Sequence, residues 1–472
     1  MKGTLSGGTR GLLLSASLLG LGACATAPAP ATGPAPRPPS AYALEAATAG
    51  PEAAWPEAAW WRAYGDPQLD GLIEEAVAGA PTLRSADARM RKAEALARQS
   101  RAGLLPELSS AGSVQMAQQS ETLGQPVPKG WDDNGRATLN LAWDLDLWGR
   151  NRAAPAAAVS EAEAARADAA AARLALSTAV AAAYADLAGA FADLDAARDA
   201  VAVRGQTADL MRARQQSGLE NEGAVQRAVS AHAAAQADLA RAEEAVTLGR
   251  HRLAALLGAG PDRGLAIARP TLKGLGAAGA PADLAAELIG RRPDVRAARL
   301  RAEAAAGRIK VARAQFYPNV NLAAFYGLQS LNLADFTKAG SEIGGVGPAV
   351  SLPIFNGGRL RAGLRGAEAD YDAVVAAYDD ALVQALRETA DALASRRALT
   401  ARLERTQAAE AAAETAWTVA RDRYRGGLAT YLDVLTAEDA LIAARRSAAQ
   451  LDTQAFTHDV ALVRALGGGF RS

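Results

Sequence analysis

Apolar and polar residues alternate along several segments of this chain, as they do in a β-strand with one apolar and one polar face. The clearest segment is 137–147, which carries an apolar side chain at every second position: Leu139, Leu141, Trp143, Leu145 and Leu147. Residues 107–118 show the same period, and the segment 119–136 between the two contains several Gly and Pro residues. The pattern therefore predicts a hairpin of two strands joined by a loop.

A second pair of alternating segments, 318–329 and 346–355, predicts another hairpin later in the chain. Pro348 and Pro353 weaken the last strand, because proline has no backbone N–H to donate. Strands of about 9–11 residues can cross the apolar layer of a membrane at a tilt. A water-soluble sandwich would show the same alternation, but two hairpins so far apart in the sequence make that fold awkward.

The number of predicted strands limits how they could sit in a membrane. A membrane barrel needs about eight or more strands, and an open sheet edge in lipid leaves backbone groups unpaired at several kcal/mol each. Four strands cannot meet that requirement within one chain. If the strands cross a membrane, at least two copies of the chain must combine them, and the pattern does not choose the number.

Long Ala-rich segments with helical periodicity follow each predicted hairpin. Residues 151–216 contain one proline, Pro155, in the first turn, where proline is tolerated. Apolar residues recur there at alternating spacings of about four and three, which predicts a coiled-coil seam: Leu176, Val180, Tyr184, Leu187, Phe191, Leu194 and Val201. Roughly 65 helical residues span about 100 Å, too long for burial inside a globule, so a bundle or tube is expected.

The remaining predicted helices complete a repeated order of elements. Helices are expected over 219–257 after the first long helix, and over 359–424 and 428–466 after the second hairpin. A shorter helix precedes each hairpin, over 67–104 and from Pro293 to about residue 315. No stretch after the N-terminal region approaches the ~18 uninterrupted apolar residues of a membrane-spanning helix.

The two halves of the chain match at a nearly constant offset. Gly149 and Gly358, Gly218 and Gly427, and Leu257 and Leu466 are pairs of equivalent residues, each pair 209 residues apart. Self-similarity at this scale predicts two structural copies in one chain. We assign the first copy to 56–260, a linker to 261–282, the second copy to 283–468 and a short tail to 469–472.

The N-terminus has the features of an export signal. A short apolar run, 12–21, follows Lys2 and Arg10, and residues 1–23 are interpreted as a signal peptide. The run ends in Leu-Gly-Ala-Cys, which resembles the cleavage site of bacterial lipoproteins, so Cys24 is predicted to carry lipid. Cys24 is the only cysteine, and a buried structural cysteine is the alternative. Residues 24–55 are rich in Pro and Ala and are expected to form a tether.

Composition and scattered motifs give no support for an enzyme or a nucleic-acid-binding protein. The chain has 51 basic and 51 acidic residues, so charge does not favour nucleic acid. Residues 274–279 spell a glycine-rich dinucleotide fingerprint, but no strand is predicted before it and Pro281 follows. His232, His251 and His458 do not have metal-ligand spacing. We expect no catalytic residue, no cofactor and no metal.

Five short motifs occur in order along the chain. They are WWRAYGDPQL at 60–69, RPDV at 292–295, FYP at 316–318, LPIFNGGR at 352–359 and YRGGLATYLDVL at 424–435. With them the chain resembles the TolC/OprM-like outer-membrane efflux channels, in the NodT-type lipoprotein branch, over about residues 55–468. Each motif is modestly specific, but their joint order and spacing are highly specific.

The resemblance implies a mainly α protein with a membrane β-barrel. Three copies would form one shared barrel of 12 strands above a long periplasmic coiled-coil barrel of helices. The protein would be lipid-anchored in the outer membrane, project into the periplasm and passively conduct small molecules such as drugs. Its partners would be two further copies, a periplasmic adaptor protein, an inner-membrane transporter of the resistance-nodulation-division (RND) type and outer-membrane lipid, with no nucleic acid.

One other transport role and one role of a different class share some of these features. An outer-membrane channel of a type I system that secretes peptides or proteins has the same fold. A periplasmic adaptor is also a lipoprotein with helical hairpins, but it should have one hairpin flanked by small β domains. A soluble coiled coil is a third alternative, which the alternating strands oppose.

The resemblance places two periplasmic tips at the turns 216–221 and 425–430. Gly218, Leu219, Gly427, Leu428 and Arg423 are expected to contact the adaptor, and simple turns are the alternative. The first copy reads Gln-Gln-Ser where the second reads Tyr-Arg-Gly, so the two adaptor grooves would not be equivalent.

Asp433 matches an acidic position that lines the closed aperture in the family. A ring of such carboxylates would favour cations. Thr430 and Asp433 also have the spacing of a capping box, which only starts a helix, and both roles are compatible. A second acid common in the family is replaced here by Thr436, and the first copy has Ala224 at the equivalent of Asp433.

Overall fold

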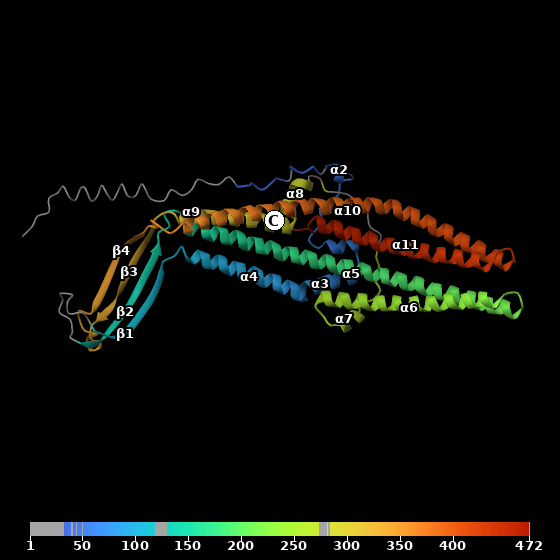
Figure 1. Ribbon diagram of the computed structural model, residues 1–472, viewed down its shortest axis with the longest axis horizontal. Coiled ribbons are helices and arrows are strands. Elements are labelled where there is room, and N and C mark those ends of the chain that lie inside the picture. The colour runs from blue at the N-terminus through green and yellow to red at the C-terminus, as the bar shows by residue number, and fades with distance from the viewer. Residues whose placement is uncertain are drawn as a thin grey trace, which may run out of the picture. The chain divides into compact units, whose positions relative to one another are not determined.

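The structure is a computed structural model that describes residues 33–38, 41–43, 45–49, 51–118, 130–272, 281 and 284–471. It divides into two compact units. The first comprises residues 1–36, 90–165 and 298–378, and the second comprises 37–89, 166–297 and 379–472. Cys24, the signal peptide and the glycine-rich segment 274–279 lie outside the described residues. The chain is mainly helical, as predicted, with one antiparallel sheet (Figure 1).

The first unit contains a sheet of four antiparallel strands in the order β1-β2-β3-β4. The strands are β1 (Glu107–Gln118), β2 (Trp131–Asp144), β3 (Asn319–Ser330) and β4 (Glu342–Ser351). β1 has the bounds that the alternation predicts, and β3 differs from them by one residue. β2 and β4 both begin and end earlier than predicted, since pairing with β1 and β3 extends their first halves.

Proline and a strained aspartate determine where β2 and β4 end. Asp146 has a positive φ of 46°, which a strand cannot accommodate, so β2 ends before it. Pro353 follows the end of β4, whereas Pro348 lies inside β4 opposite Leu322. Proline is tolerated at that position because β4 is an edge strand, hydrogen-bonded on one side only.

The register of the sheet collects most of its apolar residues on one face. Leu141 stands opposite Leu108 on one side and Ala324 on the other, and Leu139 stands opposite Tyr326. Residues directly opposite each other share a face, so the alternation seen in each strand continues across the sheet. The side chains on this face are exposed in the single chain, as Val346 is at 77%. The sheet therefore presents an apolar surface that the described residues of the chain leave exposed.

The helices of the first unit flank the strands in sequence. They are the second part of α4 (Pro81–Ala102), the start of α5 (Arg150–Gln216), most of α9 (Pro293–Ala314) and the start of α10 (Arg359–Arg425). α9 and α5 approach closely, because a Cβ on Gly307 would lie 2.9 Å from that of Ala157. The ion pair between Arg308 and Glu161, at 3.0 Å, also joins these two helices.

The second unit contains two long helical hairpins, α5 with α6 (Glu222–Leu257) and α10 with α11 (Tyr431–Ala465) (Figure 1). Shorter elements surround them: α2 (Glu45–Thr48), η2 (Trp60–Tyr64), α3 (Pro67–Gly79), α7 (Pro261–Leu265) and α8 (Leu284–Arg291). In the main core cluster, the predicted seam of α5 is buried at Leu176, Val180, Tyr184, Leu187 and Leu194. Phe191 packs against the same cluster, so the predicted coiled-coil face is the core face.

One expectation about the helices was wrong. The single helix predicted over 67–104 is broken at Ala80, whose extended backbone is the conformation favoured before proline, and Pro81 starts α4. The linker predicted over 261–282 contains the short helix α7, which Pro261 starts. The motif at 60–69 has a packing role, because Asp66 caps α3 and accepts a 2.6 Å hydrogen bond from the Tyr184 hydroxyl.

One helix has the average hydropathy of a membrane-spanning segment, although it has no uninterrupted apolar stretch of that length. α5 contains a window of 18 residues that is long and apolar enough, by composition, to cross a membrane. Half of that window is buried inside the protein. A buried helix of a helical bundle has the same composition, and the many alanines of α5 account for it.

Candidate functional site at the hairpin tips

Each helical hairpin reverses at a glycine with left-handed backbone conformation. Gly218 has φ 70° and Gly427 has φ 72°. After each glycine, a leucine N–H donates to the carbonyl five residues earlier, from Leu219 to Arg214 at 2.9 Å and from Leu428 to Arg423 at 2.8 Å. This is the Schellman arrangement, in which glycine avoids the steric cost of positive φ. The glycine turns predicted at both positions are confirmed.

The helices that follow the turns begin later than predicted. α6 starts at Glu222 because the Asn221 side chain accepts a hydrogen bond from the Ala224 N–H, at 3.0 Å. α11 starts at Tyr431 after the N-cap Thr430. The turns therefore extend three residues further than the hydrophobic pattern indicated, and side-chain caps determine where they end.

Apolar side chains project from both turns. Leu219 is 65% exposed, Leu428 is 73% exposed and Leu432, the second residue of α11, is 66% exposed. Arg423 braces the second turn, since its guanidinium donates to the Leu428 carbonyl at 3.4 Å. The structure thus brings Arg423 and Leu428 together, and each of the two turns carries its own exposed leucine.

A cluster of buried residues joins the two hairpins just behind the turns. We call it the tip cluster: Ala208, Met211, Ala224, Val225, Ala228, Tyr424, Tyr431 and Val434. The Tyr424 hydroxyl donates to Glu220 at 3.1 Å, and the Arg214 guanidinium lies 4.8 Å from the Tyr424 ring. Burial and the hydrogen bond to Glu220 raise the pKa of Tyr424 to about 12, so it remains a donor at physiological pH.

An ion pair lies deeper between the hairpins. Glu438 is 1% exposed, and its Oε1 lies 3.6 Å from Arg204 Nε. Arg204 also pairs with Asp439 at 2.5 Å, so one guanidinium of α5 holds two acids of α11. Burial raises the pKa of Glu438, and the charge of Arg204 counteracts that shift. Sequence reasoning missed this pair and the tip cluster, because no local spacing links α5 to α11.

Asp433 forms a capping box with Thr430. Its Oδ2 accepts hydrogen bonds from the Thr430 N–H and hydroxyl, both at 2.8 Å, and its own N–H donates to Thr430 Oγ1 at 3.4 Å. The hydrogen bonds from the Thr430 side chain and backbone lower the pKa of Asp433, so its exposed carboxyl is ionised at neutral pH. The capping role is confirmed, and the gate role stays a prediction.

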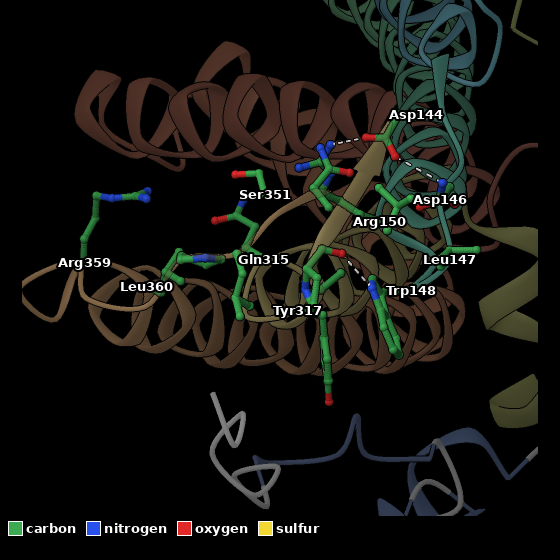
Figure 2. Close-up of a pocket in the computed structure, with 16 residues that line it drawn as sticks. Asp144, Asp146, Leu147, Trp148, Arg150, Gln315, Tyr317, Ser351, Arg359 and Leu360 are labelled. Atoms are coloured by element: carbon green, nitrogen blue, oxygen red, sulfur yellow. Dashed lines mark hydrogen bonds and ion pairs between the residues drawn. The ribbon is translucent and has the colours of Figure 1, made fainter. Parts of the chain in front are cut away.

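Figure 2 shows a different part of the chain, where strands pass into helices in the first unit. A cavity of about 430 Å³ there is lined by residues that include Asp144, Arg150 and Trp148. Asp146 accepts hydrogen bonds from the Asn151 and Arg152 N–H groups, at 2.7 and 2.9 Å, and so caps α5. Arg150 pairs with Asp144, and Trp148 donates to the Pro318 carbonyl at 2.7 Å (Figure 2). These contacts give Trp148 and Arg150, which flank the repeated glycine Gly149, a structural role.

Metal binding has no candidate in the described part of the chain. Among those residues, no group of three His, Cys, Asp or Glu side chains is placed to hold a metal ion. The contacts at the turns and in the tip cluster are packing, capping and ion pairing. Such contacts can hold the two helical hairpins together and can present the exposed turns to a partner.

Comparison with known proteins identifies the family. Residues 72–259 and 284–468 match the family described as outer membrane efflux protein. The chain belongs to this family. The fusaric acid resistance protein FusA of Burkholderia cepacia is 40% identical over 325 residues, which are 67% of this chain but 61% of FusA, less than two thirds of its length. The multidrug resistance outer membrane protein MdtP of Escherichia coli K12 is 30% identical over 431 residues, 89% of this chain and 88% of MdtP.

Solved structures in the outer membrane efflux protein family have the same fold. The crystal structure of the outer membrane protein VceC from Vibrio cholerae matches with a TM-score of 0.84 and 45% identity. The match covers 88% of this chain and all of VceC. The predicted resemblance to TolC/OprM-like channels is therefore confirmed, as is the mainly helical fold of an outer-membrane efflux channel. Known relatives are efflux and channel proteins, and the chain is an efflux protein of the outer membrane.

Proposed function

We propose that three copies of this chain form the outer-membrane channel of a tripartite efflux pump. Each copy contributes four strands to a shared barrel of 12, and the long helices form a tunnel in the periplasm. The channel conducts small molecules passively, and an inner-membrane RND transporter drives them through it with the help of a periplasmic adaptor. The names of FusA and MdtP, which refer to fusaric acid and to multiple drugs, support small organic molecules as cargo.

The unpaired edges and the exposed apolar face of the sheet are the main support for this proposal. β1 and β4 are edge strands with unpaired backbone groups, and one face of the sheet is apolar and exposed. In lipid each unpaired backbone group costs several kcal/mol, so the edges must pair with other strands. Pairing β4 of one copy with β1 of the next pairs both edges, except at Pro348, which has no N–H to donate, and turns the apolar face toward lipid. The family match in two segments supports an internal duplication, with one hairpin of strands from each copy.

The proposal predicts both a trimer and a pore. Native mass spectrometry of the purified protein should give a mass three times that of the lipidated chain, and the same sample should form ion-conducting pores in a planar bilayer. A sample that is monomeric, or that is trimeric but never conducts ions, would contradict it.

We propose that the two turns bind the adaptor through their exposed leucines. Leu428→Ser should lower adaptor affinity by about tenfold, as expected for an exposed apolar side chain that becomes buried in an interface. Stability should change by less than about 0.5 kcal/mol, because Leu428 is exposed in the single chain. Accumulation of a fluorescent dye in cells of the native host reports the loss of efflux.

The matched control for this prediction is Leu248→Ser. Leu248 is 57% exposed on α6, away from the turns. Dye accumulation in this variant should equal that of the wild type at equal protein levels in the outer membrane. Equal dye accumulation in Leu428→Ser and Leu248→Ser would show that the second turn does not bind the adaptor through Leu428.

We propose that Asp433 acts both as a helix cap and as a negative charge in the closed aperture, and two substitutions separate these roles. Asp433→Asn keeps an oxygen that accepts from Thr430 but removes the charge, so cation selectivity should fall while α11 stays intact. Thr430→Ala keeps the charge but removes the cap, which costs about 1 kcal/mol of local stability. Reversal potentials in a salt gradient measure ion selectivity. An unchanged reversal potential in Asp433→Asn would exclude the aperture role and leave Asp433 with the capping role alone.

We propose that Cys24 carries the lipid that anchors the mature chain in the outer membrane after residues 1–23 are removed. Cys24→Ser should abolish incorporation of radiolabelled palmitate. Because Cys24 is the only cysteine, no other thiol can substitute for it. Labelling that survives the substitution would exclude this lipoprotein assignment.

A further inference from the structure

A cavity of about 320 Å³ lies in the second unit among helices α5, α10 and α11. We call it the α5–α11 cavity. Its apolar lining includes Leu441 and Ile442 of α11 and Ala196 of α5, and α10 contributes Trp417. Leu441 is almost fully buried, so the cavity reaches the interior of the helical unit. None of its lining residues belongs to the turns or to the tip cluster.

The charged residues of the cavity leave an excess of negative charge. Four acids and two arginines line it. Both arginines are neutralised in ion pairs. Arg269 pairs with Asp195 at 2.6 Å, and Arg445 pairs at 3.0 Å with Glu414, which does not line the cavity. Asp199 and Glu410 have neither an ion pair nor a hydrogen bond among the described residues.

A buried acceptor is also left unsatisfied in the lining. Glu438 is 1% exposed and lines the cavity, and within the described structure its Oε1 accepts no hydrogen bond. The nearest cationic atom, Arg204 Nε, lies 3.6 Å away, beyond hydrogen-bond distance. Buried carboxylate oxygens in folded proteins normally have a hydrogen-bond donor, and this one has only the ion pair with Arg204, so it adds an acceptor to the acidic lining of the cavity.

Trp417 adds an aromatic surface to this acidic lining. The guanidinium of Arg421 lies 4.6 Å from the centre of its ring, so the ring already stabilises one cation. An indole beside unpaired carboxylates, with Leu441 and Ile442 as apolar floor, matches a ligand that is both positively charged and apolar. An anion would meet two unpaired acids, and a neutral apolar molecule would leave both acids without a partner.

We propose that the α5–α11 cavity binds amphipathic organic cations, with Trp417 and the aliphatic residues holding the apolar part and Asp199 and Glu410 facing the charge. This goes beyond passive conduction, because the channel protein itself would hold such a compound at a defined site in its helices. Binding of a cation in the α5–α11 cavity does not require ion conduction through the channel. A negative result for cation binding therefore leaves the proposed channel function standing, and a negative result for conduction leaves the cavity proposal standing.

The test uses two ions of nearly the same shape and opposite charge, tetraphenylphosphonium and tetraphenylborate. Isothermal titration calorimetry of the full-length protein in amphipol should show saturable binding of the phosphonium ion and none of the borate at the same concentrations. Asp199→Asn and Glu410→Gln should each weaken phosphonium binding by about fivefold, the size expected for one partly exposed charge pair.

Three variants complete the test. Glu404→Gln removes an acid from α10 outside the cavity, so phosphonium binding should be unchanged. Ala196→Leu fills the cavity with all acids present and should abolish binding. Circular dichroism melting curves equal to wild type show that the variants are folded. Equal binding of both ions, absence of binding, or full binding by Ala196→Leu or by the combined Asp199→Asn, Glu410→Gln variant would overturn the proposal.

Discussion

Gly327→Ala is expected to prevent the sheet from forming. Gly327 lies in β3 opposite Thr138, and an added Cβ would stand 2.0 Å from the Ala137 carbonyl oxygen and 2.7 Å from the Thr138 Cα. Both atoms belong to the backbone of β2 and cannot rotate away. Overpacking of this kind costs about 3 kcal/mol or more when the backbone itself must move.

The location of the clash makes the effect large. Pairing of β2 with β3 is the one strand ladder that joins the two hairpins of the described sheet. Separating β2 from β3 would expose two further strand edges, which the membrane does not tolerate. We therefore expect Gly327→Ala to be nearly absent from the outer membrane fraction, as measured by immunoblot after sucrose-gradient fractionation.

Gly347→Ala is the matched control for Gly327→Ala. Gly347 lies in β4 on the same face of the sheet, and no atom lies within 4 Å of a Cβ added there. The protein level of this variant in the outer membrane should equal that of the wild type. A normal level of Gly327→Ala would mean that β2 and β3 do not pair in this register.

Features that depend on short stretches of sequence were predictable. The bounds of β1, the buried seam around Tyr184 and the turns at Gly218 and Gly427 all follow from periodicity or from the backbone freedom of glycine. The capping box of Asp433 was also visible, because a cap and its partner are three residues apart. Such features depend on neighbours along the chain, which the sequence supplies directly.

Features that depend on pairing between distant segments were not predictable in the same way. Tyr424 bonds to Glu220 across two hairpins, and only the packing of those hairpins brings the two together. β2 reaches back to Trp131 because β1 offers a partner there, although residues 131–136 do not alternate. Glu438 looks like any acid on a helix surface, and its burial depends on how α5 packs on α11.

Arg204→Met is expected to loosen the two hairpins by leaving Glu438 as a buried charge without a partner. Removal of one member of a buried ion pair costs about 3–5 kcal/mol, because the remaining charge keeps its desolvation penalty. Hydrogen–deuterium exchange should show faster exchange in α5 and α11 around residues 204 and 438, with protection elsewhere unchanged. Arg241→Met is the control, since Arg241 pairs with Asp238 on an exposed surface and its loss should cost less than about 0.5 kcal/mol.

Protonation or neutralisation of Glu438 should reverse the effect of Arg204→Met. Burial already raises the pKa of Glu438, and removal of Arg204 takes away the positive charge that lowers it. A group with a raised folded-state pKa contributes its stability fully below its unfolded pKa, and that contribution is lost as pH rises through the folded value. Protection of α5 and α11 in Arg204→Met should therefore be lowest at neutral pH and should rise as the pH falls. At each pH it is compared with the protection of the same helices in Arg241→Met. Glu438→Gln in the Arg204→Met background should restore most protection at neutral pH, and if it does not, the hairpins are held by the packing of the tip cluster and not by this ion pair.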